Sequence, residues 1–230
     1  MRTVVFGASK GLGLSLTKRL LASGHRVAAA ILERHPPMAL DALTQQYGDM
    51  LLIKSADITD EDEIIDFAKS VALFMGKVDS LCTVAGVIMP GDIENPKLHT
   101  SDISDLRRTF EVNFFGPVAV VKYFYPHMEK GGKILTITSE GVNLANAYAF
   151  IPCYALSKTA ATKASGVFNA SVDDVDFYAV HPGRPKTDMN PNGEIEPEES
   201  AKGIYNIMAG KVPLSRDTWY IDYKANPMEL

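Results

Sequence analysis

The chain has 230 residues, of which 46% are hydrophobic and 22% charged, a composition typical of a soluble globular protein with one large domain. A net charge of -5 argues against nucleic acid as a partner, and no lysine- or arginine-rich run indicates an anionic membrane. The apolar runs are too short to span a bilayer, and the N-terminal residues do not resemble a signal peptide. We therefore expect a cytoplasmic protein with Cys82 and Cys153 reduced and no metal site.

Short apolar runs alternate with helical patterns along the chain. Strands are predicted at residues 3–7, 25–32, 50–57, 79–86, 131–139, 175–183 and 218–223. Helices are predicted at residues 11–22, 38–47, 60–73 and 101–128, around Tyr154, and at 196–210. Strands separated by helices indicate right-handed crossovers and a parallel sheet covered on both faces. The sequence thus predicts an α/β fold: a single Rossmann-type, doubly wound domain of about seven strands over residues 1–230.

A glycine-rich loop, GASKGLG at residues 7–13, joins the first predicted strand to the first helix. Its spacing differs from the common G-x-G-x-x-G fingerprint, but the physical requirements are the same. Gly7 permits a tight turn, Gly11 lets the backbone approach a pyrophosphate, and Gly13 lets helix and strand pack closely. The free N–H groups at the start of the helix then face the anion.

With this loop and further motifs in matching order, the chain resembles the short-chain dehydrogenase/reductase family over nearly its whole length. One position departs from the family pattern, because Thr83 and Val84 stand where the family has two asparagines that tie the sheet together. The residues that carry the resemblance are Gly7, Gly11, Gly13, Asp57, Ile58, Ala85, Gly86, Asn113, Ser139, Tyr154, Lys158, Pro182, Gly183 and Thr187.

The resemblance implies hydride transfer between a nicotinamide cofactor and a carbonyl or alcohol substrate. Its catalytic residues would be Asn113, Ser139, Tyr154 and Lys158, with Tyr154 as general acid or base. A free tyrosine has a pKa of about 10, and a nearby ammonium such as that of Lys158 favours the phenolate. Lys158 would also hold the nicotinamide ribose, Ser139 would polarise the substrate oxygen, and Asn113 would hold a water that links Lys158 to solvent.

The cofactor identity depends on the residues after the second strand and in the glycine loop. Glu33 lies near the position of an acid that selects NAD, but in family register that position falls at about Ile31. Lys10, with Arg34, favours NADP(H), which we expect in preference to NAD(H). The cofactor contacts that the resemblance implies are Gly7, Ser9, Lys10, Gly11, Leu12, Gly13, Arg34, Asp57, Ile58, Ala85, Gly86, Tyr154, Lys158, Pro182, Gly183 and Thr187.

The substrate is a small carbonyl or alcohol of open identity, because sugars, steroids, acyl chains and small ketones all fit the pattern. A short segment at 190–199 indicates a short lid. The predicted apolar lining is Met89, Val142, Leu144 and Met189. The family also implies a homodimer or homotetramer formed through the helices that carry Asn113 and Tyr154. Two alternatives remain. One is a cofactor-binding regulatory protein with little turnover, and the other is a dehydratase or epimerase of the family's extended branch, ranked last because this chain has no room for that branch's larger C-terminal domain.

Overall fold

The structure is a computed structural model that describes residues 1–145 and 149–230. Its described strands form one seven-stranded sheet in the order β3-β2-β1-β4-β5-β6-β7, and each pair of neighbours is parallel. The fold is the predicted doubly wound α/β class. The strands are β1 (Arg2–Phe6), β2 (Arg26–Ile31), β3 (Leu51–Ser55), β4 (Val78–Thr83), β5 (Met128–Ile137), β6 (Val175–His181) and β7 (Tyr220–Asp222).

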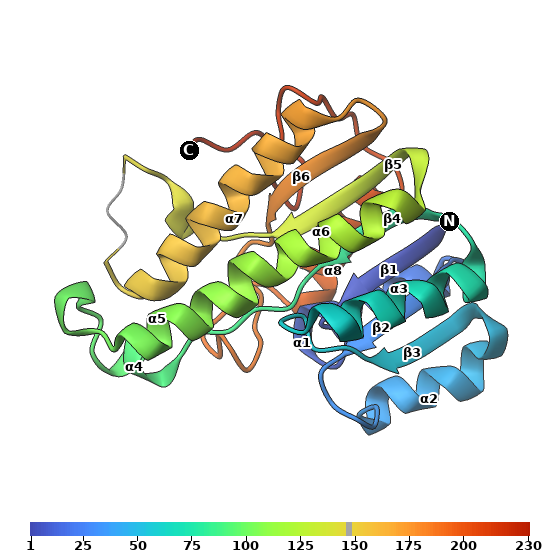
Figure 1. Cartoon of the computed structure of the whole chain (residues 1–230), viewed down its shortest axis with the longest axis horizontal. Coiled ribbons are helices and arrows are strands. Elements are labelled where there is room, and N and C mark those ends of the chain that lie inside the picture. The colour runs from blue at the N-terminus through green and yellow to red at the C-terminus, as the bar shows by residue number, and fades with distance from the viewer. Residues whose placement is uncertain (146–148) are drawn as a thin grey trace.

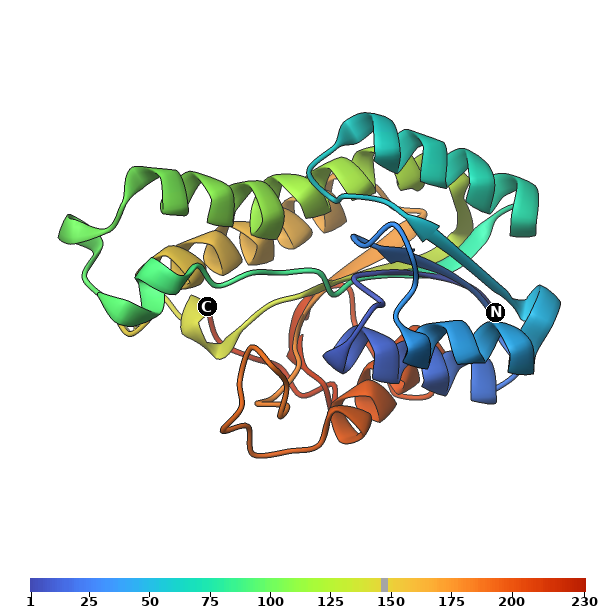
Figure 2. The same ribbon diagram turned by 90° about the horizontal axis from the view of Figure 1, so that it is seen from below.

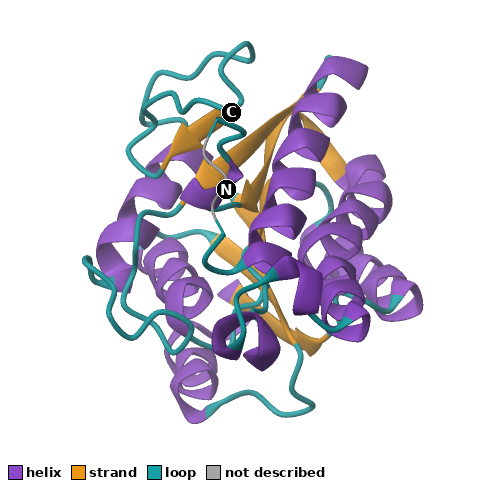
Figure 3. Ribbon diagram, turned by 90° about the vertical axis from the view of Figure 1, so that its left-hand side faces the viewer, coloured by secondary structure: helices purple, strands orange, loops and turns teal. Residues whose placement is uncertain are grey.

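Helices cover both faces of the sheet, as Figures 2 and 3 show. One layer holds α1, α2 and α8, and the other holds α3, α5, α6 and α7. The short α4 lies beside the beginning of α7 (Figure 1). The helices are α1 (Gly11–Ala22), α2 (Met38–Tyr47), α3 (Glu61–Met75), α4 (Pro90–Glu94), α5 (Ile103–Phe110), α6 (Gly116–Phe124), α7 (Pro152–Ser171) and α8 (Pro197–Met208).

The side chains of β1 show why the strands are apolar on both faces. Val5 packs into the core cluster under α1, α2 and α8, whereas Val4 and Phe6 pack into the cluster under α3 and α6. The Phe6 ring meets the rings of Phe67 and Phe124 edge-on, with centroids 5.3 and 5.5 Å away. Burial of alternate side chains on opposite faces fixes the strand between two helix layers.

The long helix predicted at 101–128 is divided in the structure. It runs as α5, a π-helical turn at Glu111–Phe115, α6 and a 3-10 turn at Tyr125–His127. The fifth strand begins at Met128, three residues before its predicted start at 131, and α4 was not predicted. Of these differences, the π turn bears on the candidate site, because it holds Asn113 and π turns occur often at functional sites.

The strand order reverses between β1 and β4. In open parallel sheets, ligands bind beyond the carboxyl ends of the strands at this kind of switch point. The glycine loop follows β1, and Ala85 and Gly86 follow β4, so the two predicted motifs flank this switch point.

Candidate active site

The glycine loop has the backbone geometry that its glycines predict. Gly7 has a φ of +84°, a left-handed conformation that favours glycine, and a Cβ there would lie 2.6 Å from the backbone nitrogen of Ala85. A Cβ on Gly13 would collide with the carbonyl oxygen of Gly7. The loop is therefore packed at Gly7 directly against the segment after β4, and at Gly13 the beginning of α1 packs against the loop itself.

The beginning of α1 is open to an anion. Lys10 is the N-cap residue but its side chain makes no capping hydrogen bond, and the first turn holds no acidic residue. Its N–H groups and the positive end of the helix dipole thus fit a dinucleotide pyrophosphate. Lys10 instead extends to Asp188, with Nζ 3.0 Å from Oδ2, and both side chains are largely exposed. Of the other predicted loop contacts, Leu12 is buried and Ser9 is half-buried.

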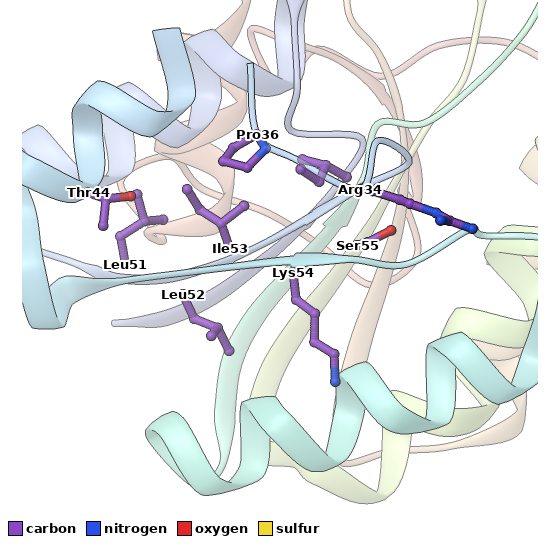
Figure 4. Close-up of a pocket in the computed structure, with 9 residues that line it drawn as sticks. Arg34, Pro36, Thr44, Leu51, Leu52, Ile53, Lys54 and Ser55 are labelled. Atoms are coloured by element: carbon purple, nitrogen blue, oxygen red, sulfur yellow. The ribbon is translucent and has the colours of Figure 1, made fainter. Parts of the chain in front are cut away.

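The residues predicted to bind the adenosine half lie after β2 and β3. Asp57 accepts hydrogen bonds at Oδ1 from the N–H and hydroxyl of Thr59, each at 2.8 Å, and Ile58 is buried. Arg34 is exposed beyond the end of β2. Arg34 also lines a cavity of about 360 Å³ along the edge strand β3, and Figure 4 shows its side chain beside Ser55. This cavity belongs to the sheet edge and contains none of the predicted catalytic residues.

The segment after β4 is held without the two asparagines of the family pattern. The Thr83 hydroxyl donates to the carbonyl oxygen of Leu135 on β5 at 3.4 Å, and the N–H groups of Val84 and Ala85 donate to the carbonyl of Phe6. A threonine hydroxyl and backbone bonds therefore tie β4 to its neighbours. Gly86 follows Ala85 at once and lies close to two of the predicted catalytic residues, because a Cβ there would be 3.3 Å from Asn113 Oδ1 and from Lys158 Nζ.

Tyr154 and Lys158 lie one turn apart on α7. The ammonium nitrogen of Lys158 is 5.7 Å from the centre of the Tyr154 ring and donates to the carbonyl oxygen of Ile137 at 2.8 Å. A Cβ on Gly86 would lie 3.3 Å from the same nitrogen. Lys158 is buried, and burial lowers the pKa of its ammonium to about 8. The predicted Tyr-Lys pair thus meets the crevice at the switch point.

Asn113 is fully buried in the π turn between α5 and α6. Its Oδ1 accepts from the N–H of Val87 at 2.8 Å, and its Nδ2 donates to the carbonyl of Val87 at 2.9 Å and to Ser157 Oγ at 3.0 Å. The carboxamide therefore joins the segment after β4 to α7. Both polar atoms of the carboxamide bind protein, and the water that Asn113 is expected to hold stays a prediction.

Ser139 begins the turn that follows β5. Its Oγ accepts from the N–H of Gly141 at 3.2 Å, and its carbonyl accepts from the Tyr220 hydroxyl at 3.0 Å. That turn packs against α7, which brings Ser139 to the same side of the sheet as Tyr154. Glu140, the next residue, forms an ion pair with Arg184 at 3.5 Å, and both side chains are partly exposed.

The segment after β6 packs against the glycine loop. The Pro182 carbonyl accepts from Ser200 Oγ at 2.7 Å, and Gly183 has a φ of +76°. Thr187 lies against Gly11, where a Cβ would be 3.2 Å from its methyl carbon. The structure therefore brings the predicted Pro-Gly motif and the predicted glycine loop together.

One predicted pocket-lining residue is wrong, and two supporting residues were missed. Val142 is fully buried in a core cluster with Ala179 and Tyr220, because the turn after β5 folds inward. Tyr220 holds the Ser139 carbonyl, and Asp92 holds the beginning of α7. No local sequence motif marks either residue, because each one bonds to a segment that is distant along the chain.

The fold and the glycine loop define a Rossmann-type protein with the elements of a dinucleotide site. A family model for short chain dehydrogenases matches residues 2–197. The chain belongs to this family of oxidoreductases.

Two curated relatives and two solved structures illustrate the family. A fatty acyl-CoA reductase of Acinetobacter baylyi is 32% identical over 173 residues, which are 74% of this chain and 56% of that enzyme. A 1-hydroxy-2-glutathionyl-2-methyl-3-butene dehydrogenase of Rhodococcus sp. is 29% identical over 93% of each chain. A Pseudomonas aeruginosa carbonyl reductase in complex with NADP has a TM-score of 0.84 and 23% identity, with both chains fully covered. A Burkholderia multivorans family member with bound NADP has a TM-score of 0.85, 23% identity and coverage of 100% and 99%.

No helix within residues 1–145 and 149–230 is long and apolar enough to cross a membrane. In the same residues, no group of three or more His, Cys, Asp and Glu side chains is arranged to hold a metal ion.

Proposed function

We propose that the chain is a single NAD(P)-binding domain over residues 1–230 that reduces a carbonyl compound, or oxidises the corresponding alcohol, with NADP(H). The observation that carries this proposal is the buried Lys158 ammonium beside the Tyr154 ring at the switch point of the sheet. When bound, the nicotinamide dinucleotide supplies or accepts the hydride.

The protein residues in this proposal bind, orient and move a proton. The Tyr154 hydroxyl gives its proton to the substrate oxygen in reduction and takes it back in oxidation. A positive charge on Lys158 favours the phenolate that this transfer leaves. Ser139 donates a hydrogen bond to the same oxygen and so favours the charge that develops on it.

The cofactor would be held by three groups of residues. The glycine loop and the open start of α1 would hold the pyrophosphate, Asp57 and Ile58 the adenine, and Lys158 the nicotinamide ribose. Lys10 and Arg34 support NADP(H), because both are exposed cations, Lys10 in the glycine loop and Arg34 after β2. A basic side chain in this region accommodates the 2′-phosphate of NADP. The exposed Lys10–Asp188 pair contributes only about 0–1 kcal/mol, so a phosphate can replace its carboxylate partner at little cost.

Turnover by the purified protein tests the function. The assay follows NADPH oxidation with ketones, aldehydes and a fatty acyl thioester, and NADP+ reduction with a hydroxylated glutathione conjugate, classes suggested by the relatives. Tyr154→Phe is expected to lower kcat by a factor of about 10²–10⁴, the usual contribution of acid–base catalysis. Tyr205→Phe is the matched control, because Tyr205 also pairs with a lysine, Lys211, at 2.7 Å but on α8.

Two outcomes of this assay would contradict the proposal. Equal turnover by wild type and Tyr154→Phe would exclude Tyr154 as the proton donor. Cofactor binding without turnover of any substrate would instead favour the regulatory alternative. Trp219, the single tryptophan, packs on Gly166 of α7, and its fluorescence is the signal to be followed in a cofactor titration. Tighter binding of NADH than of NADPH in that titration would reverse the cofactor assignment.

We also infer a cytoplasmic homo-oligomer. Two buried free cysteines support a reducing compartment. Phe115 on the π turn and Leu156 and Val167 on α7 are apolar and between 43% and 54% exposed, which supports an interface on these helices. A monomeric mass by size-exclusion chromatography with light scattering would contradict the oligomer.

A further inference from the structure

The helix that carries Tyr154 has no local cap. Pro152 is its first residue, and Ile151 occupies the N-cap position without a polar side chain. Cys153 and Tyr154 occupy the second and third helical positions. A serine or aspartate at the N-cap would accept a hydrogen bond from the backbone N–H of one of these two residues. These groups lie in the first turn of the helix and need a partner from elsewhere.

Asp92, on the short helix α4, is that partner. Its Oδ1 accepts from the N–H of Cys153 at 3.0 Å, and its Oδ2 accepts from the N–H of Tyr154 at 2.9 Å. The two contacts span 61 and 62 residues of sequence, and Asp92 is only 1% exposed. A buried carboxylate is costly unless it is well bonded, and the positive end of a helix dipole stabilises it.

The position of Asp92 gives this cap a consequence that a local cap would not have. Asp92 follows Val87, whose backbone is held by Asn113, and Asn113 also binds Ser157 on α7. The segment from 87 to 92 is therefore bonded to α7 directly at Asp92 and is joined to it through Asn113 at Val87. Because the same segment follows Gly86, these bonds set the distance between the first turn of α7 and Gly86.

We propose that Asp92 is a positioning residue that holds the Tyr154 phenol in place over the cofactor crevice. The inference rests on the proposed function, since it assigns a role within that reaction. Asp92 touches neither substrate nor cofactor in this role and acts through the backbone of Tyr154. A misplacement of about 1 Å in a reacting group can lower a rate by about 10²-fold.

The test compares Asp92→Ala and Asp92→Asn with Asp60→Ala. Asp60 is the matched control, because its Oδ1 also accepts two backbone N–H groups, at 2.9 and 3.2 Å, but at the exposed start of α3. We expect Asp92→Ala to lower kcat on the order of 100-fold, with KM for NADPH changed less than about two-fold. Asp92→Asn keeps one acceptor oxygen and should recover part of kcat. Asp60→Ala should keep the wild-type kcat at saturating cofactor.

Hydrogen exchange of the peptide containing Cys153 and Tyr154 gives a readout that does not depend on turnover. Exchange there should be faster in Asp92→Ala and unchanged in Asp60→Ala. If Asp92→Ala does not fold, Asp92→Asn carries the same comparison with a smaller expected loss. An inactive wild type would overturn the proposed function and this inference with it. An active wild type with unchanged kcat in the folded Asp92 variants would overturn this inference alone.

Discussion

Lys158 is a buried cation that forms no salt bridge with any residue that the structure describes. Its hydrogen bond to the Ile137 carbonyl offers a dipole, and its ammonium lies near the Tyr154 ring. Burying a charge without a counter-charge costs free energy, because the charge loses its hydration, and this cost lowers the stability of the folded protein. A residue retained at such a cost is a mark of function more than of stability.

The stability of the protein should therefore rise with pH in the alkaline range. Burial lowers the pKa of Lys158 from an ordinary 10.5 to about 8. Between these values the unfolded chain keeps a proton that the folded chain has lost, so the free energy of unfolding increases with pH. The full effect of Lys158 is roughly 3 kcal/mol, with the cost present below pH 8 and gone above about pH 10.5.

Urea unfolding of wild type and Lys158→Met at several pH values between 7 and 10.5 measures this effect. The variant has no ammonium to bury and should lack the rise that Lys158 causes. Groups distant from Lys158 are common to both proteins and cancel in the comparison. Repeating it in a Tyr154→Phe background removes any contribution from the neighbouring phenol. Parallel pH profiles for the two proteins would contradict the assignment.

The candidate site was predicted from sequence residue by residue, but the contacts that support it were not. Tyr154 and Lys158 stand four apart on a helix, so their common face follows from helix geometry alone. Asp92 and Tyr220 act across long stretches of chain, and no periodicity relates them to the groups they hold. Val142 was predicted to line a pocket because it is apolar, but an apolar residue next to a site can equally turn into the core.

The helical run from Ile103 to Phe124 is the element that sequence described least well. Its apolar pattern continues through the π turn at Glu111–Phe115, so the pattern predicts one long helix. The local change at Asn113 coincides with side-chain bonds to Val87, which belongs to another segment. By contrast, α3 has Asp60 as its N-cap and acidic residues in its first turn, and such local signals predicted it well.

Replacing Asn113 by alanine should destabilise the protein as well as the site. The change removes the partners of both backbone groups of Val87 and the bond to Ser157. A buried polar group left without a partner costs about 1–3 kcal/mol, so we expect a loss of roughly 2–4 kcal/mol in the free energy of unfolding. Chemical denaturation measures it, with Asn95→Ala as control.

Asn95 is a suitable control because it is exposed and, among the contacts described, its side chain bonds only to the Thr100 hydroxyl, at 2.8 Å. Its replacement should cost less than about 0.5 kcal/mol, as for most surface changes. Equal losses in the two variants would show that the Asn113 bonds do not join the segment after β4 to α7 in solution.

At the scale of the whole molecule, the site depends on the order of the strands. The glycine loop follows β1, Asp57 follows β3, Ala85 and Gly86 follow β4, and Lys158 bonds to the end of β5. Alternation of strands and helices, with right-handed crossovers, is enough to predict that these segments meet at one edge of a parallel sheet. This is why the chain order of weak motifs predicted the location of the site.

A cofactor that bridges these segments should stabilise the folded protein as a whole. Ligand that binds only the folded state at 100 times its Kd adds about 2.7 kcal/mol of stability. For a chain of about this size that corresponds to a rise in Tm of roughly 5–11 °C. At equal concentrations NADPH should produce a larger rise than NADH, because Lys10 and Arg34 are exposed cations near the expected ribose.

Gly13→Ala supplies the control for this shift. Its methyl group would press on the Gly7 carbonyl and open the loop that faces the pyrophosphate, so the variant should lose most of the NADPH-induced rise. Gly24→Ala adds the same atom in open space at a left-handed position, so it tests whether any glycine replacement has this effect. Thermal unfolding with and without each cofactor measures all three proteins. An NADPH-induced rise retained in Gly13→Ala would place the cofactor away from the loop, and a larger rise with NADH would assign the protein to NAD.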